Sequence, residues 1–572
     1  MDRIYFHFSH SHIKPVFLML ALFSDHLHSR FIESKMEDIY HFNHDCIHEL
    51  SRILTDDTIL LSLSCSSKST RSCFFSRDYF ICNNNYTNDQ ISMFTHVKEL
   101  NLRDKIIDLN SFRYLERLIC GGPIRELNLH DYSKLTYFYD FRSMQCIHFA
   151  KLIYLKYLNC YFGNNIENFI YLQSLRCHIK ASPLFDLSLL FHLTNLDLEC
   201  EIQKESTHQK VNLSSAIKLI RLSAVSIDFS KISLMGDKLT WLDLYKSMNI
   251  SFSNLIRIRV LLLSPSQNIN IFDDGRSFQY LTHLDTDNNT SINFHHLTNL
   301  KFLEIKKVDS NVNLSCLTSL EILTFKHTIS NNIDLTSLIN LKHLNFTNYA
   351  NINSQINLPK NITYLCFEQK KPKKVVCTYE WNTREQIYNI LKQVENMSNL
   401  QKLELIHISL SDKINNSSLT KLILSKCEFK PCYNFVNVKR IVLEEVNGKE
   451  IDMKYLSGLK KLTLKNCSGF TETHFDELKS LENLKLKNFA SPINFNNIAT
   501  LTQFGLYEFS RNIRIRKLKN LKCLKTDNID LFFELCKYKL PRSVKDVYIK
   551  AGSKYLGDIM KFEMKGVNLH WI

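Results

Sequence analysis

The chain has 572 residues, 44% hydrophobic and 23% charged, which is the balance of a folded protein and excludes a largely disordered one. Its 12 glycines and 9 prolines are far fewer than average, which argues against Gly-rich phosphate loops and catalytic turns. The net charge is +15, and the 17 scattered cysteines indicate a reducing compartment. Several occupy apolar places and are predicted to be buried thiols: Cys160, Cys177, Cys366, Cys427 and Cys467.

Residues 1–35 form an N-terminal extension of uncertain status. An apolar stretch at residues 15–24 follows Arg3 and Lys14, which is the arrangement of a signal peptide, although the stretch is too short to span a membrane. The free thiols argue against secretion, so we expect a cytoplasmic location and consider Met36 an alternative start. The histidines near the start are interpreted as a solvated tail, and neither a metal site nor a cofactor is expected.

Residues 36–80 are predicted to contain two short helices. Ile47, Leu50 and Leu54 lie at helical spacing on one apolar face, and Leu60 and Leu61 belong to a second apolar run after a break at Asp56-Asp57. In purely physical terms, this segment would be a helical cap that shields the open core of the repeats described below.

The order of residues 42–71 also resembles an F-box. Phe42 and Asn43 stand where that family has Leu-Pro, and Lys68 and Arg71 match its basic pair. The apolar positions of its two helices are matched by Ile47, Leu50, Leu54, Leu60 and Leu61. The resemblance implies that these side chains and Phe42 contact a Skp-type adaptor of a cullin-RING ubiquitin ligase, while the following segment selects the substrate.

After a linker or cap at residues 81–96, the pattern Leu-x-x-Leu-x-Leu recurs along most of the chain, mostly at steps of 19 to 22 residues. A strand with this alternation turns its leucines inward, and stacked neighbours then share one core. We call the central apolar residues the anchors: Leu100, Leu118, Phe138, Leu158, Leu175, Leu196, Leu222, Leu242, Leu284, Leu303, Leu323, Leu344, Leu365, Leu403, Leu422, Ile441, Leu462, Leu484, Phe504 and Leu524.

This pattern resembles the leucine-rich repeat family over about residues 97–549, which implies an α/β solenoid with a curved parallel sheet on its concave face. The solenoid is predicted to span residues 97–550, with residues 551–572 as a C-terminal cap. Residues 358–365 and 540–544 contain proline and are similar to the FNIP subclass. The asparagine usual after the strand is mostly replaced, for example by Cys427 and Cys467, so the turns must satisfy their backbone groups otherwise.

An insertion is predicted at about residues 366–400, because the step from Leu365 to Leu403 is 38 residues. It holds the lysine cluster of residues 370–374, interpreted as a solvated loop, with a nuclear localisation patch as the alternative. A helix is expected to follow, with Asn382 as its N-cap and Glu385 three residues later. Its apolar face comprises Ile387, Ile390, Leu391 and Val394.

The outward residues of the strands are the expected binding surface. Residues 451–550 contain 19 Lys plus Arg and 10 Asp plus Glu, so an acidic protein partner is expected. Nucleic acid is less favoured, because these strands lack interleaved aromatics and arginine pairs, and the lysines could instead serve solubility alone. The predicted target-binding residues are Lys461, Thr463, Lys465, Lys485, Lys487 and Lys525.

No catalytic constellation accompanies these features. Glu444 and Glu445 lack a matched histidine or nucleophile, and no Gly-x-Ser-x-Gly, phosphate-loop or zinc-helix motif occurs. The sequence therefore predicts a non-enzyme: the substrate-recognition subunit of a Skp-cullin-F-box ubiquitin ligase. The alternative is a stand-alone leucine-rich repeat scaffold for protein–protein interaction. Neither a membrane nor a nucleic acid is expected as a partner.

Overall fold

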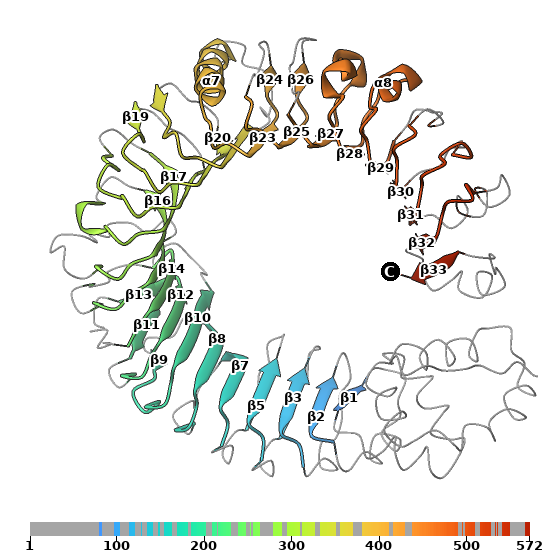
Figure 1. Ribbon diagram of the computed structural model, residues 1–572. Coiled ribbons are helices and arrows are strands. Elements are labelled where there is room, and N and C mark those ends of the chain that lie inside the picture. The colour runs from blue at the N-terminus through green and yellow to red at the C-terminus, as the bar shows by residue number, and fades with distance from the viewer. Residues whose placement is uncertain are drawn as a thin grey trace, which may run out of the picture. The chain divides into compact units, whose positions relative to one another are not determined.

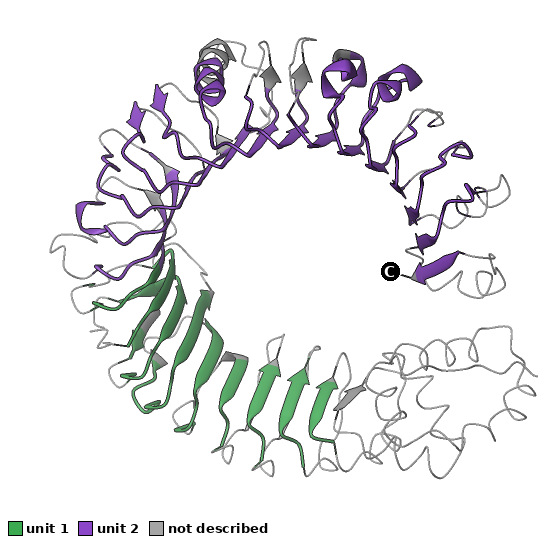
Figure 2. Cartoon of the chain, viewed as in Figure 1, with its two compact units in different colours: residues 1–260, 266–269 green, residues 261–265, 270–572 purple. Residues whose placement is uncertain are grey.

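A computed structural model describes most of residues 97–549 outside short connecting loops, together with residues 79–82 and 567–571. The predicted F-box-like helices, the apolar stretch of residues 15–24 and the lysine cluster of residues 370–374 lie outside the described residues. The chain divides into two compact units, shown in Figure 2. Unit 1 comprises residues 1–260 and 266–269, and unit 2 comprises residues 261–265 and 270–572.

In unit 1, successive repeats contribute parallel strands to one sheet (Figure 1). These strands are β1 (Tyr79–Cys82), β2 (Glu99–Leu102), β3 (Arg117–Cys120), β5 (Tyr137–Asp140), β7 (Tyr157–Phe162), β8 (Ser174–Lys180), β10 (Asn195–Glu201), β12 (Arg221–Val225) and β14 (Trp241–Tyr245). Shorter strands form small separate sheets: β4 (Leu127–Asn128) with β6 (Ile147–His148), and β11 (Gln209–Asn212) with β9 (Phe185–Asp186) and β13 (Ile227–Asp228).

Unit 2 repeats the same construction. Its parallel strands are β16 (His283–Asn288), β17 (Phe302–Lys307), β18 (Ile322–Phe325), β20 (His343–Tyr349), β22 (Tyr364–Gln369), β23 (Lys402–Ile406), β25 (Lys421–Ser425), β27 (Arg440–Glu444), β28 (Lys461–Lys465), β29 (Asn483–Lys487), β30 (Gln503–Tyr507), β31 (Cys523–Thr526), β32 (Asp546–Ile549) and β33 (Asn568–Trp571). Strand β15 (Val260–Leu263) contains the boundary between the units.

The remaining elements of unit 2 are short, apart from one helix. Two-residue strands pair as β19 (Ile333–Asp334) with β21 (Ile356–Asn357) and as β24 (Ser409–Leu410) with β26 (Glu428–Phe429). Among the described residues, the helices include α7 (Glu380–Glu395), α8 (Glu472–Asp476) and the 3-10 turns η3 (Phe294–His296), η4 (Gly448–Glu450) and η5 (Met453–Leu456). Within this unit the parallel strands line the inner side of the arc, whereas α7 and α8 lie on its outer side (Figure 1).

The anchors confirm the predicted leucine-rich repeat fold. All of them lie in strands of the parallel sheet, and each is at most 2% exposed. They also lie opposite one another in register, as Leu303, Leu323 and Leu344 do on β17, β18 and β20. Because the strands are parallel and in register, equivalent side chains stack directly, so the anchors of successive repeats form a continuous row of the core.

A second inward position follows each anchor by two residues and completes this core. In the middle of unit 2 it holds Phe325, Phe346 and Phe367, whose rings stack at centroid distances of 5.3 and 4.6 Å. All three side chains are at most 1% exposed. Stacked rings bury large apolar areas and so stabilise consecutive repeats against separation.

The sheet extends beyond the predicted bounds of 97–550. At one end β1 pairs with β2, which places Phe80 opposite Leu100, and at the other end β33 pairs with β32. A further anchor, Leu261 on β15, is fully buried and was missed between Leu242 and Leu284. Its strand reads Val-Leu-Leu-Leu, and this continuous apolar run hides the alternation by which the other strands are recognised.

The long step between Leu365 and Leu403 is one repeat with a helix in its return segment, because these anchors lie opposite each other on β22 and β23. The helix is α7, and its buried residues include the predicted Ile390, Leu391 and Val394. Its predicted start is wrong, since α7 begins at Glu380 and Asn382 lies inside the first turn rather than at the N-cap.

In the turns after the strands, two kinds of hydrogen bond take the place of those that the missing asparagines would make. The thiols of Cys427 and Cys467 donate hydrogen bonds to backbone carbonyls of the preceding repeat, those of Leu405 and Leu443, at 3.2 and 3.4 Å. In several repeats the residue before the turn position adopts a left-handed conformation, as Lys426 does at φ 54°, and its N–H donates a hydrogen bond to the next repeat. Cys177, Cys366, Cys427 and Cys467 are buried free thiols, as predicted; the side chain of Cys160 lies outside the described residues.

Candidate functional site

The six predicted target-binding residues all lie on one face of the sheet of unit 2, and we call them the lysine face. They come from β28, β29 and β31, where inward leucines alternate with side chains that are exposed or half-buried. The strand register places Thr463 opposite Lys485 and Lys465 opposite Lys487. The alternation therefore gathers residues that are about 20 positions apart in sequence on neighbouring strands.

The cations of the lysine face differ in their partners. Lys465 and Lys487 form ion pairs with Glu444 and Glu508, at 3.6 and 3.2 Å, which partly neutralises them. Among the described residues, no ion pair involves Lys461 or Lys485, and both side chains are exposed. Lys461 and Lys485 are therefore the charges that an incoming carboxylate would meet first.

A glycine separates Lys485 from Lys525 on the lysine face. The register places Gly505 of β30 between them, and a Cβ atom at this position would lie 2.9 Å from the Tyr507 ring and 3.3 Å from Cγ of Lys485. A side chain at this position would thus collide with its neighbours. Because Gly505 has no side chain, the surface of β30 is recessed between Lys485 and Lys525.

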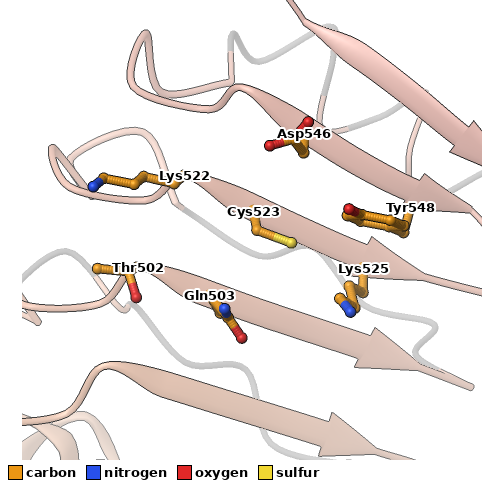
Figure 3. A pocket seen from close by; sticks show the side chains of 7 residues that line it. All are labelled: Thr502, Gln503, Lys522, Cys523, Lys525, Asp546 and Tyr548. Carbon is orange, nitrogen blue, oxygen red and sulfur yellow. The ribbon is translucent and has the colours of Figure 1, made fainter.

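A shallow pocket of about 360 Å³ lies over β30, β31 and β32 (Figure 3). Lys525 and Tyr548 stand together at one end, with the Lys525 ammonium 4.7 Å from the ring centroid, and His570 stacks on the same ring at 4.4 Å. The aromatic ring is thus fixed by neighbours from two strands. The pocket is lined by Thr502, Gln503, Lys522, Cys523, Lys525, Asp546 and Tyr548.

The titratable groups of this pocket are not arranged for catalysis. Burial raises the pKa of the Cys523 thiol, so it is protonated at neutral pH and is not an activated nucleophile. Hydrogen bonds from His570 and Asn568 lower the pKa of Asp546, which keeps this carboxylate ionised and occupied by protein partners. The pocket can therefore offer an aromatic ring and charges of both signs to a bound side chain.

A basic row at the start of the strands extends the lysine face, and sequence analysis missed it. Lys402, Lys421, Arg440 and Lys461 occupy the position just before the anchor on β23, β25, β27 and β28, directly opposite one another. Burial, followed by the nearby charges of Lys402 and Arg440, lowers the pKa of Lys421. Lys402 is neutralised by Glu404 at 3.0 Å and lies 3.8 Å from the Tyr364 ring. Comparing the residue before each anchor across repeats would have revealed this row.

Other site predictions receive no structural test. The predicted adaptor-binding residues Phe42, Ile47, Leu50, Leu54, Leu60 and Leu61 lie outside the described residues. Within the part of the chain that the structure describes, no cluster of three or more histidine, cysteine or carboxylate side chains is placed to hold a metal ion. In that same part, no helix has the length and apolar character needed to cross a membrane.

No protein-family model matches the sequence, and no curated protein sequence matches it either. Solved structures with a similar course of the chain include the functional domain of InlJ from Listeria monocytogenes (17% identity, 73% of this chain and 74% of that one, TM-score 0.30). A leucine-rich repeat protein of Leptospira interrogans shows 16% identity over 81% of this chain and 92% of its own, with a TM-score of 0.29. Mouse RP105 in complex with MD-1 shows 12% identity, 86% and 89% coverage and a TM-score of 0.40.

These similarities are limited to the repeat architecture. The class of protein is defined by the chain's own geometry: a parallel β-solenoid of leucine-rich repeats with few helices in the described part, whose anchors stack in register within each unit. Its accessible chemistry in unit 2 is a basic strand face beside a shallow aromatic pocket.

Proposed function

We propose that this chain is a protein-interaction scaffold that binds an acidic protein partner through the lysine face of unit 2. The observation that carries this proposal is the placement of Lys461 and Lys485 on adjacent strands, exposed and without an ion pair among the described residues. The backbone that carries these two cations is already ordered in the sheet, so it loses little conformational entropy when a partner binds. Complementary charge then favours encounter with an acidic surface.

The neighbouring features support a protein partner over a simple polyanion. The Tyr548 ring, held between Lys525 and His570, offers apolar area beside the charges, and aromatic residues next to cations are typical of binding hot spots. Asp546 adds a negative charge to the pocket, which would repel a phosphate backbone. A partner with carboxylates and an apolar or cationic side chain fits this arrangement best.

The test compares proteins captured by the full chain with those captured by the double variant Lys461→Glu, Lys485→Glu, using quantitative mass spectrometry of a eukaryotic lysate. We expect a set of acidic proteins to be lost with the variant. The matched control is Lys479→Glu, an exposed lysine before β29 and away from the strand face, and it should retain the same proteins. Capture that is unchanged in the double variant, or lost equally in the control, would refute the assignment to this face.

A second candidate function rests on the order of residues 42–71, which resembles an F-box. In that case the chain would link its target to a Skp-type adaptor and a cullin, act as a substrate-recognition subunit for ubiquitylation and work in the cytoplasm or nucleus. The proposed contact residues are Phe42, Ile47, Leu50, Leu54, Leu60 and Leu61. This function adds a partner to the scaffold and leaves the lysine face in the same role.

The two candidates separate in one co-purification. The full chain is compared with the variant Leu50→Asp, Leu54→Asp, and the captured proteins are probed for a Skp-type adaptor and a cullin. Recovery of both with the unmodified chain alone would support the ligase subunit. If neither is recovered while the acidic target is still captured through the lysine face, the chain is a stand-alone scaffold.

A further inference from the structure

A second surface lies in unit 1, and it becomes visible when one position is compared through all repeats. This position is four residues before each anchor, just ahead of the strand. For the anchors Leu118 to Leu242, every residue at this position that the structure describes is aromatic, histidine or lysine. We call these residues the aromatic–basic row: Tyr114, Lys134, Tyr154, Tyr171, His192, Lys218 and Lys238.

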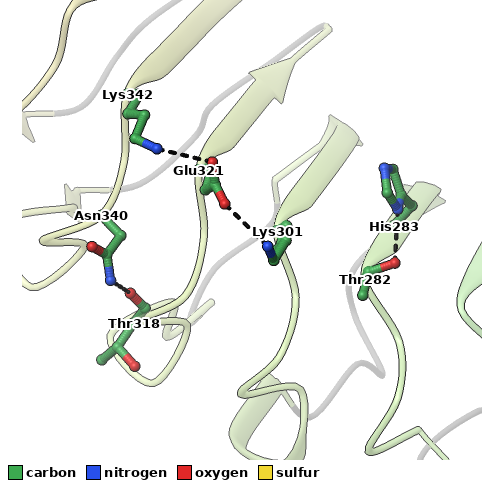
Figure 4. A network of polar contacts seen from close by, with 7 residues as sticks. All are labelled: Thr282, His283, Lys301, Thr318, Glu321, Asn340 and Lys342. Atoms are coloured by element: carbon green, nitrogen blue, oxygen red, sulfur yellow. Dashed lines mark hydrogen bonds and ion pairs between the residues drawn. The ribbon is translucent and has the colours of Figure 1, made fainter.

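In unit 2 the same position has a different chemistry and a structural role. After Tyr280 it holds only small polar residues or glycine among the described repeats. Asn340, for example, donates its amide N–H to the carbonyl of Thr318 in the preceding turn at 2.8 Å (Figure 4). Asn299, Asn361, Asn437 and Asn520 bond to the equivalent carbonyls at 2.7 to 3.0 Å. The fold thus accommodates, and uses, a short polar side chain here.

The large residues of unit 1 are therefore not required by the repeat itself. They contact one another instead: the rings of Tyr154 and Tyr171 stack at 6.2 Å, and Tyr171 lies 5.8 Å from the His192 ring. The Lys218 ammonium lies 3.2 Å from His192. Tyr154 remains 54% exposed and Tyr171 45% exposed, so this stacking leaves much of each ring open to solvent.

A second apolar row runs beside the first. One position earlier in the repeats, Ile170, Phe191 and Ile217 are 42%, 47% and 53% exposed. Exposed apolar side chains that recur at one position in successive repeats form a continuous strip, and such strips on folded proteins are typical of interaction sites. Isolated exposed residues would need no explanation, but this strip is several repeats long.

Charge indicates the partner. The aromatic–basic row contains three lysines and no carboxylate. Two residues later in each repeat, the only charged residues among those described are Glu116 and Lys156, whose opposite charges sum to zero. In unit 2 several charges two residues before the anchor are paired, as Lys301 and Lys342 are with Glu321 at 3.4 and 3.1 Å (Figure 4). The strip of unit 1 is thus both apolar and positively charged, and its complement is apolar and negatively charged.

We infer that the aromatic–basic row binds an acidic polypeptide segment that carries aromatic or aliphatic side chains. At about 4.8 Å per strand, seven positions span roughly 29 Å, which an extended segment of about nine residues would cover. A single-stranded nucleic acid fits less well, because the stacking of Tyr154 on Tyr171 leaves less ring area open for bases. The aliphatic neighbours also offer nothing to phosphates.

The test measures fluorescence anisotropy of the full chain with labelled peptides of about twelve residues, long enough to cover the row. One library mixes Asp and Glu with Leu, Phe and Tyr, a second replaces the apolar residues by Ser, and a third probe is an oligothymidylate of matched charge. We expect the mixed peptides to bind most tightly. No binding by any mixed peptide, equal binding of the serine peptides, or tighter binding of the oligonucleotide would overturn the proposal.

The variant Tyr154→Asn, Tyr171→Asn installs the residue that unit 2 uses at this position, so it should preserve the fold. Loss of each ring should weaken mixed-peptide binding by about tenfold. Tyr280→Asn, at the same position in unit 2, and the lysine-face variant Lys461→Glu, Lys485→Glu should leave it unchanged. If circular dichroism shows that the tyrosine variant is unfolded, the double variant Lys134→Glu, Lys218→Glu is measured in its place. Undiminished peptide binding by a folded variant of either kind would refute the site.

Discussion

The carboxylate pair of Asp285 and Glu304 gives the sharpest stability prediction. These residues lie opposite each other on the outward face of β16 and β17 in unit 2. Burial, followed by the charge of Glu304, raises the pKa of Asp285 from 3.8 to about 6, although Lys306 and Lys326 act in the other direction. We expect Asp285→Asn to stabilise the protein at neutral and alkaline pH.

The sign and size follow from proton linkage. Between pH 4 and 6 the folded state binds a proton at Asp285 that the unfolded state has released, so stability falls as pH rises through about 6. A change in pKa from 3.8 to about 6 corresponds to about 3 kcal/mol at most. Solvent screening of this half-exposed carboxyl reduces the expected gain to about 1–3 kcal/mol at pH 8. The gain should vanish near pH 4.

The assay is urea unfolding followed by circular dichroism, between pH 4.5 and 8, for the wild-type protein and Asp285→Asn. Asp334→Asn is the control of opposite sign, because the N–H and hydroxyl of Thr336 lower the pKa of Asp334 and that variant should lose stability at pH 8. An Asp285→Asn protein that is no more stable than wild type at pH 8, or whose advantage persists unchanged to pH 4.5, would show that the pair does not oppose folding.

Three further predictions concern the core, the turns and the lysine face. Phe346→Ala removes the middle ring of a buried stack and should cost about 3–5 kcal/mol of unfolding free energy, with Phe346→Leu costing clearly less in the same urea titration. Cys467→Ala loses the thiol hydrogen bonds to Leu443 and Lys465 and should cost about 1 kcal/mol, whereas an unchanged midpoint would deny these bonds a role. Lys485→Glu should leave the melting temperature unchanged while weakening capture of acidic partners, most strongly at low salt.

The sequence by itself determined the strands, their inward residues and the repeat class. The reason is physical: each anchor, such as Leu303 or Leu462, sits in a short alternating pattern whose burial depends only on an equivalent residue about 20 positions away. Buried thiols such as Cys427 followed from the same logic. The prediction missed Leu261 because its strand is a continuous apolar run, in which the alternation of inward and outward residues cannot be recognised.

Only the tertiary structure decided what the outward residues do. Strand alternation placed Lys465 and Lys485 on the same face, but stacking alone determines that Lys465 meets Glu444 while no ion pair forms at Lys485 among the described residues. The contrast between Tyr154 in unit 1 and Asn340 in unit 2 likewise depends on contacts to a neighbouring repeat, Tyr171 for Tyr154 and Thr318 for Asn340. Such contacts join residues of different repeats, and their partners are fixed only when the repeats stack in register.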